Sequence, residues 1–368
     1  MAGLYIHIPF CVKKCEYCDF VSYVGREAEF GAYIDALCRE MRRYEGEKID
    51  TVFIGGGTPS VLPPEFIKKL CANIEYCFEV KPGAERSMEM NPGTVSEAKI
   101  EAMLAGGINR ASVGVQSFDD TELRAAGRIH TAKEAEDTVT ALDSAGFKNI
   151  SIDLMQSLPM QTEESFGKSL RTAVSLPIRH ISVYSLIIES GTPMSVKYEK
   201  GVYAEPDEDE ERELYRRTGR FLSKHGFEKY EISNYALPGY ESRHNTLYWE
   251  CGEYIGLGAA AHSYYGGARF SNTRSLREYI NGEGLGIGRE ILTERDRMSE
   301  FMMLGLRLVR GISFEDFKTR FGKDFFSVYG NTAEKFAALG LLEFSNGRCR
   351  LTERGIDVSN AVMCEFIL

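Results

Sequence analysis

Three cysteines lie close together near the start of the chain, in the segment HIPFCVKKCEYCDF at 7–20. They are Cys11, Cys15 and Cys18, with the spacing C-x3-C-x2-C. Three thiolates so close together can hold three irons of a [4Fe–4S] cluster. The fourth iron then lacks a protein ligand, because Phe20 stands where one more cysteine could follow. Since an open coordination position is where substrates or cofactors bind a metal, this spacing predicts a functional cluster.

A zinc ion is the alternative partner of these cysteines. His7, Cys38 or a remote residue would then complete a tetrahedral site. The chain has nine cysteines, an odd number, and clustered cysteines in a reducing compartment bind metal more often than they pair as disulfides. The spacing alone leaves both metals open.

A glycine run, GGGTP at 55–59, follows an apolar β-type segment. It lacks the Lys-Ser/Thr of a P-loop, so a nucleotide triphosphate site is not supported. Glycines at a strand end let backbone groups approach a ligand closely, although a tight turn alone is the alternative. Beside the cysteine loop, this run favours a small zwitterion such as S-adenosylmethionine (SAM), which would chelate the open iron. Glu89 would accept from its ribose hydroxyls, and Gln116, Arg128 and Asp153 would add polar contacts; helix caps or ion pairs are the alternative for such side chains.

Strands and helices alternate through the first half of the chain, which predicts a parallel sheet with right-handed crossovers. Near-continuous apolar runs indicate strands covered on both faces. The carboxyl ends of such strands meet at one rim, so residues from 11 to 153 should converge on one site. The expected strands are 3–9, 51–57, 86–92, 110–116, 149–155 and 180–186, and the expected helices are 27–45, 64–78, 96–106, 131–145 and 161–175.

The second half is less regular. We expect a helix at 207–225 and a strand at 227–236. Two short strands about a turn, within 339–355, are typical of a winged-helix unit. The chain is therefore predicted to have three parts: an open α/β barrel, a C-terminal extension, and a helical, winged-helix-like end. Their predicted bounds are 1–200, 201–290 and 291–368.

The segments YIHIPFCVKKCEYCDF and GGGTPS resemble the radical SAM superfamily. The lead-in before Cys11 resembles its coproporphyrinogen oxidase-like group, and the likeness continues through EMNPGT, GVQSF, GRIH and IDLM. This resemblance implies an α/β fold: a partial (β/α)6 barrel with a C-terminal α+β lid and a winged-helix-like end. It also implies that Cys11, Cys15 and Cys18 bind the cluster. The residues implied in SAM binding are Tyr5, Gly56, Gly57, Thr58, Glu89, Gln116, Arg128 and Asp153.

Two features separate the branches of this group. Oxygen-independent coproporphyrinogen III oxidases carry a cysteine where Phe20 stands, and they have an extra N-terminal arm, whereas only four residues precede Tyr5 here. The segment His244-Asn245-x-x-Tyr248-Trp249 matches the HNxxYW signature of the HemW-type haem chaperones. Both features point to the chaperone branch.

The haem chaperone resemblance implies that a neutral imidazole of His244 ligates the haem iron. Tyr248 and Trp249 would stack on the macrocycle, and His262 has a similar but weaker standing. The alternative is that His244 is a hydrogen-bonded loop residue and Trp249 fills the core.

The chain departs from the group's usual pattern at two places. Ala259 and Ala260 stand in the usual glycine-proline-glycine stretch, and Gln156-Ser157 replace Tyr-Gly in LMYGLP. Both departures lie near the expected pocket, so we expect them to affect its shape.

We therefore expect a haem chaperone that delivers haem to a respiratory protein at the membrane surface and takes an electron from a donor for its cluster. The rival is a coproporphyrinogen III dehydrogenase, an enzyme that oxidatively decarboxylates two propionates. A net charge of −10, from 44 basic and 54 acidic residues, argues against nucleic acid and against a winged-helix module that binds it. Without a signal peptide pattern or an apolar run of roughly 20 residues, a cytoplasmic location is expected.

Overall fold

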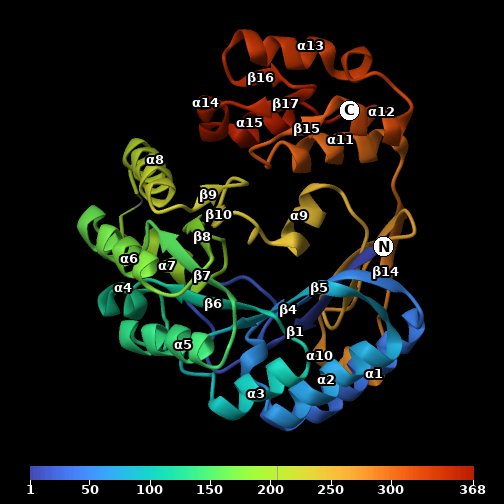
Figure 1. The fold of residues 1–368 in the computed structure, drawn as a ribbon. Helices are drawn as coiled ribbons and strands as arrows, with labels where there is room; N and C mark the ends of the chain where they lie inside the picture. The colour runs from blue at the N-terminus through green and yellow to red at the C-terminus, as the bar shows by residue number, and fades with distance from the viewer. Residues whose placement is uncertain (205) are drawn as a thin grey trace.

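The computed structural model describes residues 1–204 and 206–368, and its centre is a parallel sheet (Figure 1). Six strands follow one another in chain order, each parallel to the next. All six predicted strands are confirmed. They are β1 (Ala2–Ile8), β4 (Lys48–Gly56), β5 (Glu79–Met90), β6 (Arg110–Gln116), β7 (Asn149–Gln156) and β8 (His180–Ser185).

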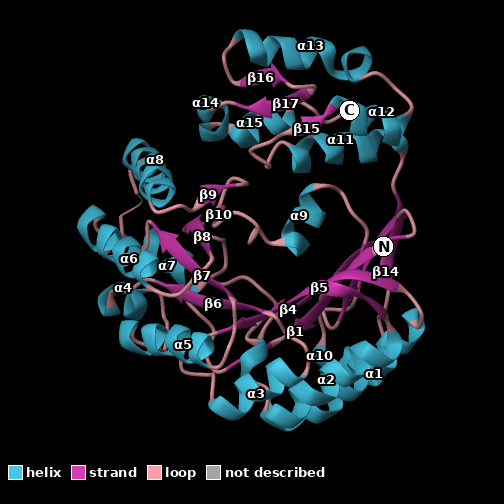
Figure 2. Cartoon of the chain, viewed as in Figure 1, coloured by secondary structure: helices cyan, strands magenta, loops and turns pink. Residues whose placement is uncertain are grey.

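Helices cover the outer side of this curved sheet (Figure 2). The five predicted helices are present, and the short α4 among them was not predicted. Thr131 and Thr162 begin two of them with reciprocal capping boxes. The helices are α1 (Phe30–Met41), α2 (Pro64–Cys77), α3 (Glu97–Ala105), α4 (Asp120–Ala125), α5 (Ala132–Ser144) and α6 (Glu163–Ser175).

Strand alternation decides which side chains enter the barrel. In β1, the side chains of Leu4, Ile6 and Ile8 are fully buried in the core. Successive side chains of a strand point to opposite faces, so Tyr5 and His7 face the other way, into the barrel interior. The fold thus separates an apolar layer under the helices from a polar interior.

Residues 201–290 extend the barrel sheet to twelve strands. On one edge, β11 (Tyr254–Leu257) pairs in parallel with β1, and β12 (His262–Tyr265), β13 (Ala268–Ser271) and β14 (Ile287–Ile291) follow antiparallel. On the other edge lie β10 (Asn234–Ala236) and β9 (Glu228–Lys229). Ile255 and Leu257 join the core of the barrel. The helices of this region and of the preceding connection are α7 (Pro193–Glu199), α8 (Glu208–Lys224), α9 (Arg243–Trp249) and α10 (Leu276–Asn281).

The single strand predicted at 227–236 is wrong, since two short strands flank a local turn. Buried Glu231 accepts a hydrogen bond from Ser233 N at 2.9 Å and another from the Asn234 side chain. These local bonds compete with the ladder and break the strand.

The last part of the chain has a core of its own, which includes Phe317, Phe325 and Phe366. Its three-stranded sheet, β15 (Ile312–Ser313), β17 (Arg348–Leu351) and β16 (Leu342–Ser345), confirms the predicted pair of strands about a turn. Among the described residues, we find no helix long and apolar enough to cross a membrane. The helices here are α11 (Glu294–Gly305), α12 (Phe314–Phe321), α13 (Phe325–Ala338), α14 (Glu353–Asp357) and α15 (Ser359–Cys364).

A buried carboxyl group ties the β11–β12 turn to α1. Glu40 accepts hydrogen bonds from Gly258 N at 2.9 Å, the Tyr279 hydroxyl at 2.6 Å and Asn272 Nδ2 at 2.7 Å. Burial raises the pKa of Glu40, although these three donors partly offset the rise. The turn that carries Ala259 and Ala260 is therefore fixed by the hydrogen bonds that Glu40 accepts.

Two residues that stand where the resembled group has glycine, Ser157 and Ala260, adopt a backbone conformation that favours glycine. Ser157 has φ +63° and Ala260 has φ +62°, both in the left-handed region. Such a backbone is strained for residues with a side chain, by roughly 1–2 kcal/mol per residue. Here the chain has changed the residue and retained the turn.

We expect Ala260→Gly to stabilise the protein by about 1 kcal/mol, because glycine adopts this φ without strain. Urea unfolding followed by circular dichroism measures the change. Ala259→Gly is the matched control: Ala259 is buried and not left-handed, so its loss should destabilise by roughly 0.5–1 kcal/mol. Equal effects of the two substitutions would contradict the strain at Ala260.

Candidate active site at the barrel rim

The cysteine loop is bonded to the ends of neighbouring strands. The Thr58 hydroxyl, just after β4, donates to the Cys11 sulfur at 3.5 Å. Arg128 Nη1 donates to the Cys15 sulfur at 3.3 Å. Between them stands Asn91, just after β5, whose Nδ2 donates to Thr58 Oγ1 at 2.9 Å and whose Oδ1 accepts from Arg128 Nη2 at 2.8 Å. We call these five residues the cysteine-to-cysteine chain.

Asn91 is the member of this chain to which sequence reasoning gave no role. Its position at a strand end, inside EMNPGT, was the available signal. The amide both donates and accepts, so it fixes the hydroxyl of Thr58 toward sulfur and the guanidinium of Arg128 toward Cys15. Hydrogen bonds to sulfur are among the factors that set the potential of an iron–sulfur cluster.

The three cysteines lie along one loop. Within residues 1–204 and 206–368, no three His, Cys, Asp or Glu side chains converge to hold one metal ion. A cluster offers three separate irons to thiolates spread along one loop. Burial raises the pKa of Cys11 and of Cys18, so loading a metal there must release protons.

The glycine run packs closely against neighbouring backbone and side chains, and two of its N–H groups are hydrogen-bonded within the protein. Gly56 N donates to Glu89 Oε2 at 2.9 Å, and Gly57 N donates to Ile8 O at 2.9 Å. A Cβ at Gly56 would clash with the His7 ring, and one at Gly57 would lie 2.7 Å from Phe10 O. Both N–H groups are bonded within the protein, and contact of this turn with SAM stays a prediction. A ligand that contacts this turn meets acceptors.

Two carboxyl groups face each other in the barrel interior. Burial and the nearby Asp153 raise the pKa of Glu89 to about 7, while the Gly56 N–H and Arg110 act in the opposite direction. Burial also raises the pKa of Asp153, against a hydrogen bond from Ser182 and the charge of Arg110. Like charges at close range disfavour double ionisation, so Glu89 is poised to change charge near neutral pH.

Gln116 ends β6 in a strained backbone conformation, with φ +69°. The ladder between β6 and β7 shifts register between Val113 and Gln116, which turns the strand end. Arg128 Nη2 donates to Gly114 O at 2.5 Å, on the same bulge. Strain of this kind clusters at functional sites, and the bulge brings Gln116 beside Asn91 and Arg128.

A cavity of about 810 Å³ lies beside the cysteine loop, within the roughly 300–1,000 Å³ typical of ligand pockets. Tyr5, one of the predicted SAM residues, lines it and bonds to His7 Nδ1 at 2.9 Å. Phe20 lines it too and is 65% exposed. The other lining side chains used below are Tyr248, Trp249, Cys251, His262, Tyr264, Arg269 and Arg274.

His244 does not line this cavity. Its side chain is fully buried on α9, where Nδ1 bonds to Thr51 Oγ1 and Nε2 to the Tyr248 hydroxyl, both at 2.8 Å. Its ring stacks on Phe53, and burial lowers its pKa to about 3. The backbone N–H of His244 donates to Glu85 on β5. In this arrangement both ring nitrogens are occupied, so the predicted iron ligation by His244 requires Tyr248 or Thr51 to move.

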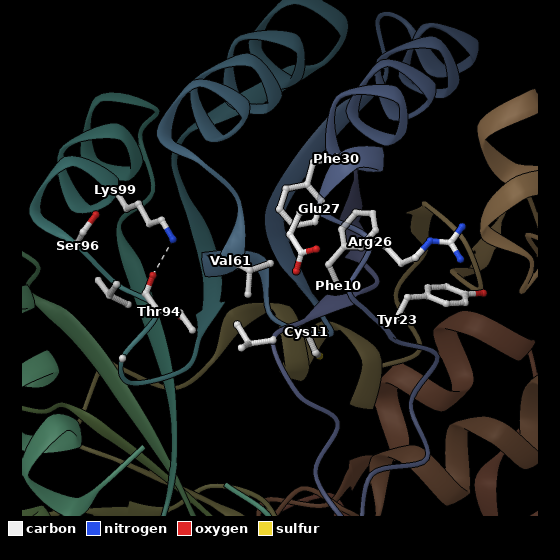
Figure 3. A pocket seen from close by; sticks show the side chains of 13 residues that line it. Phe10, Cys11, Tyr23, Arg26, Glu27, Phe30, Val61, Thr94, Ser96 and Lys99 are labelled. Atoms are coloured by element: carbon white, nitrogen blue, oxygen red, sulfur yellow. Dashed lines mark hydrogen bonds between the residues drawn. The ribbon is translucent and has the colours of Figure 1, made fainter. Parts of the chain in front are cut away.

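Cys11 also borders a separate pocket of about 390 Å³, which we call the outer pocket (Figure 3). Tyr23, Arg26 and Lys99 line this pocket, and Lys99 Nζ donates to Thr94 O at 2.8 Å. The cysteine loop is thus reached from the large cavity at Phe20 and from this outer pocket at Cys11.

Comparison with known proteins shows which family has this sequence pattern. Residues 5–173 match the family model of the Radical SAM superfamily, and residues 292–358 match that of the HemN C-terminal domain. A Lactococcus lactis protein named Heme chaperone HemW is 36% identical over 366 residues, covering 99% of this chain and 97% of that protein. Its Bacillus subtilis namesake is 37% identical, covering 100% and 99%. This chain belongs to the HemW family of radical SAM proteins.

The HemW family shares its fold with a solved structure of coproporphyrinogen III oxidase (HemN) from Escherichia coli. That structure has a TM-score of 0.85 and covers 100% of this chain and 90% of its own, at 22% identity. At this identity the likeness concerns the fold alone. It confirms the predicted partial barrel with a C-terminal domain.

We expect Thr58→Val to leave about four irons per chain while making the cluster potential more negative. The substitution removes a hydrogen bond to the Cys11 sulfur and leaves the volume nearly unchanged. Anaerobic potentiometry followed by electron paramagnetic resonance measures the potential. Thr58→Ser keeps the hydroxyl and should resemble the wild type, whereas Cys15→Ala should lose the brown absorbance altogether. An unchanged potential in Thr58→Val would show that this hydrogen bond does not reach the cluster.

Proposed function

We propose that this chain is a haem chaperone: it binds haem and passes it to a haem-requiring respiratory protein, on a core that holds a [4Fe–4S] cluster and SAM. The observation that carries the proposal is its 36–37% identity, over nearly the full length, to proteins named Heme chaperone HemW. Phe20 supports it, because an exposed aromatic ring lines the large cavity where the oxidases resembled by this chain have a cysteine.

Cys11, Cys15 and Cys18 would hold the cluster, which supplies one electron to SAM when both are bound. The chain's own contribution is to orient SAM. Carbonyl groups at Gly56 and Gly57 suit the N–H donors of the SAM amino group, because the N–H groups of the turn are already bonded. Glu89 suits the ribose hydroxyls from inside the barrel, and Tyr5, Gln116 and Asp153 complete the polar surroundings. Thr58 and Arg128 would act on the cysteines rather than on SAM.

The outer pocket beside Cys11 gives an electron donor a route to the cluster that does not cross the large cavity. The cytoplasm is the proposed location, because all nine cysteines are free and a reducing compartment keeps them so. Transfer of haem to a membrane-surface acceptor belongs to the same proposal.

Affinity for SAM should rise with pH through about 7. The hydroxyl groups of SAM donate more strongly to the ionised carboxylate of Glu89 than to its protonated form. Because the pKa of Glu89 is about 7, binding below that pH must first remove a proton from this carboxyl group. The dissociation constant should therefore be about tenfold larger at pH 6 than at pH 8. Isothermal titration of cluster-loaded protein measures it. Glu89→Gln should bind more weakly and lose this pH dependence; if the variant keeps the wild-type profile, Glu89 does not contact SAM.

The rival function is separated by substrate. We expect saturable, near one-to-one haem binding and no conversion of coproporphyrinogen III to protoporphyrinogen, even with a working reductant and SAM. Absorbance titration and chromatography of porphyrins measure the two outcomes. Phe20→Cys alone should not create turnover, because the cavity is otherwise unchanged. Robust wild-type turnover would replace the chaperone proposal with the dehydrogenase.

A further inference from the structure

We infer that haem binds in the 810 Å³ cavity, with His262 on β12 as the axial ligand of the iron and Arg274 as the partner of a propionate. This inference rests on the proposed haem function and locates its site. It assigns the ligand to the β12–β13 hairpin of the extended sheet and gives His244 a supporting role.

The hairpin presents one face to the cavity by strand alternation. In register, His262 pairs with Ser271 and Tyr264 pairs with Arg269, and these four side chains line the cavity. The intervening residues turn away, as buried Phe270 does. A planar ligand that enters the cavity therefore meets an imidazole, a phenol and a guanidinium along one flat wall.

Among the histidines and the cysteine that line the cavity, elimination leaves His262 as the ligand of haem iron. Burial raises the pKa of the lining tyrosines, so they stay neutral phenols and are poor ligands; they are Tyr5, Tyr248, Tyr254 and Tyr264. His7 is the other histidine there, and its nitrogens bond to the Tyr5 hydroxyl and to Val21 O. Burial raises the pKa of the Cys251 thiol to about 12, so it stays protonated and is a poor ligand. The His262 side chain is exposed, and its ring has no bonding partner within residues 1–204 and 206–368. A free neutral imidazole is the commonest protein ligand of haem iron.

Two arginines, Arg269 and Arg274, line the cavity and could bind the haem propionates. Arg269 already pairs with Glu300 at 2.7 Å, so its charge is compensated. The Arg274 guanidinium is exposed and bonds to none of the residues that the structure describes. Arginine matches a carboxylate with two parallel donors, which favours Arg274 as the propionate partner. Aromatic side chains, Phe20 and Trp249 among them, supply the apolar surface that a macrocycle requires.

His244 fits a positioning role. It holds the Tyr248 hydroxyl at 2.8 Å, and Tyr248 lines the cavity beside Trp249. Arg307 covers the Trp249 ring at 4.4 Å from its centroid. The HNxxYW segment thereby presents two aromatic rings to the ligand, while its histidine stays in the core.

The test compares haem with metal-free protoporphyrin IX, which has the same ring and propionates and no iron. Cluster-loaded protein is titrated with each, using the Soret band for haem and quenching of Trp249, the one tryptophan, for both. His262→Ala should shift the Soret band and weaken haem binding at least about tenfold, the loss that even an outer partner of a metal site brings. It should leave protoporphyrin binding unchanged. Added imidazole should restore the wild-type Soret position.

Arg274→Ala should weaken both ligands about threefold to tenfold without moving the Soret band. Two exposed residues away from the cavity are the matched controls: His225→Ala and Arg277→Ala should bind both porphyrins as the wild type does. His262→Met tests ligand identity without relying on loss of binding, since a thioether ligand should keep haem and raise its potential.

Unchanged haem spectrum and affinity in His262→Ala would overturn this site and leave the haem function standing. If His244→Ala instead shifted the Soret band while protoporphyrin binding stayed intact, His244 would be the ligand. Absence of saturable haem binding in the wild type would overturn the proposed function itself.

Discussion

The hydrogen-bond chain from Cys11 through Thr58, Asn91 and Arg128 to Cys15 holds the rim together. Its members come from the cysteine loop that follows β1, from the residues just after β4 and β5, and from the segment after α4, so its formation depends on the register of the parallel strands. These bonds fix the positions of two of the sulfurs, which lowers the ordering cost of holding a cluster.

The barrel interior beneath this rim holds several ionisable groups, and burial makes the charged form of each unfavourable. Burial raises the pKa of Glu89 and Asp153, and the charge of almost fully buried Arg110 partly offsets this rise. Burial, and then the charge of Arg110, lowers the pKa of His180 and His244. The histidines therefore stay neutral and act as fixed hydrogen-bonding groups: His180 joins Ser151 to Tyr230, and His244 joins Thr51 to Tyr248. Glu89, with a pKa raised to about 7, lies near its midpoint at neutral pH.

Much of this was predictable from sequence, and the failures have physical causes. The alternation of apolar runs with amphipathic segments predicted the six parallel strands. A strand that is buried on both faces is apolar along its whole length, so the pattern is easy to recognise. The shared rim followed from topology, so the strand-end residues Thr58 and Glu89 were expected beside the cysteine loop, while their contact with SAM, like that of Arg128, stays a prediction. The hydrogen-bonding of the glycine N–H groups and the part played by Asn91 were not predictable, since both depend on register between strands. The strand at 227–236 failed because the side chain of Glu231 bonds to nearby backbone.

His244 shows how a sequence signature can mark a position without giving its role. A histidine followed by Tyr248 and Trp249 on one short helix suggests a ligand with two stacking rings. The structure satisfies both of its nitrogens and buries it against Gly3, where a Cβ would come within 3.2 Å of the imidazole. A substitution at His244 would therefore disturb Tyr248 and Trp249 as well, and loss of haem binding in that variant could not by itself identify an iron ligand. His262 is a cleaner position, because its exposed ring can be removed without leaving a buried partner unsatisfied. In the proposed porphyrin site, His262 and Arg274 would hold the iron and a propionate, while Tyr248 and Trp249 of the signature helix would supply aromatic surface.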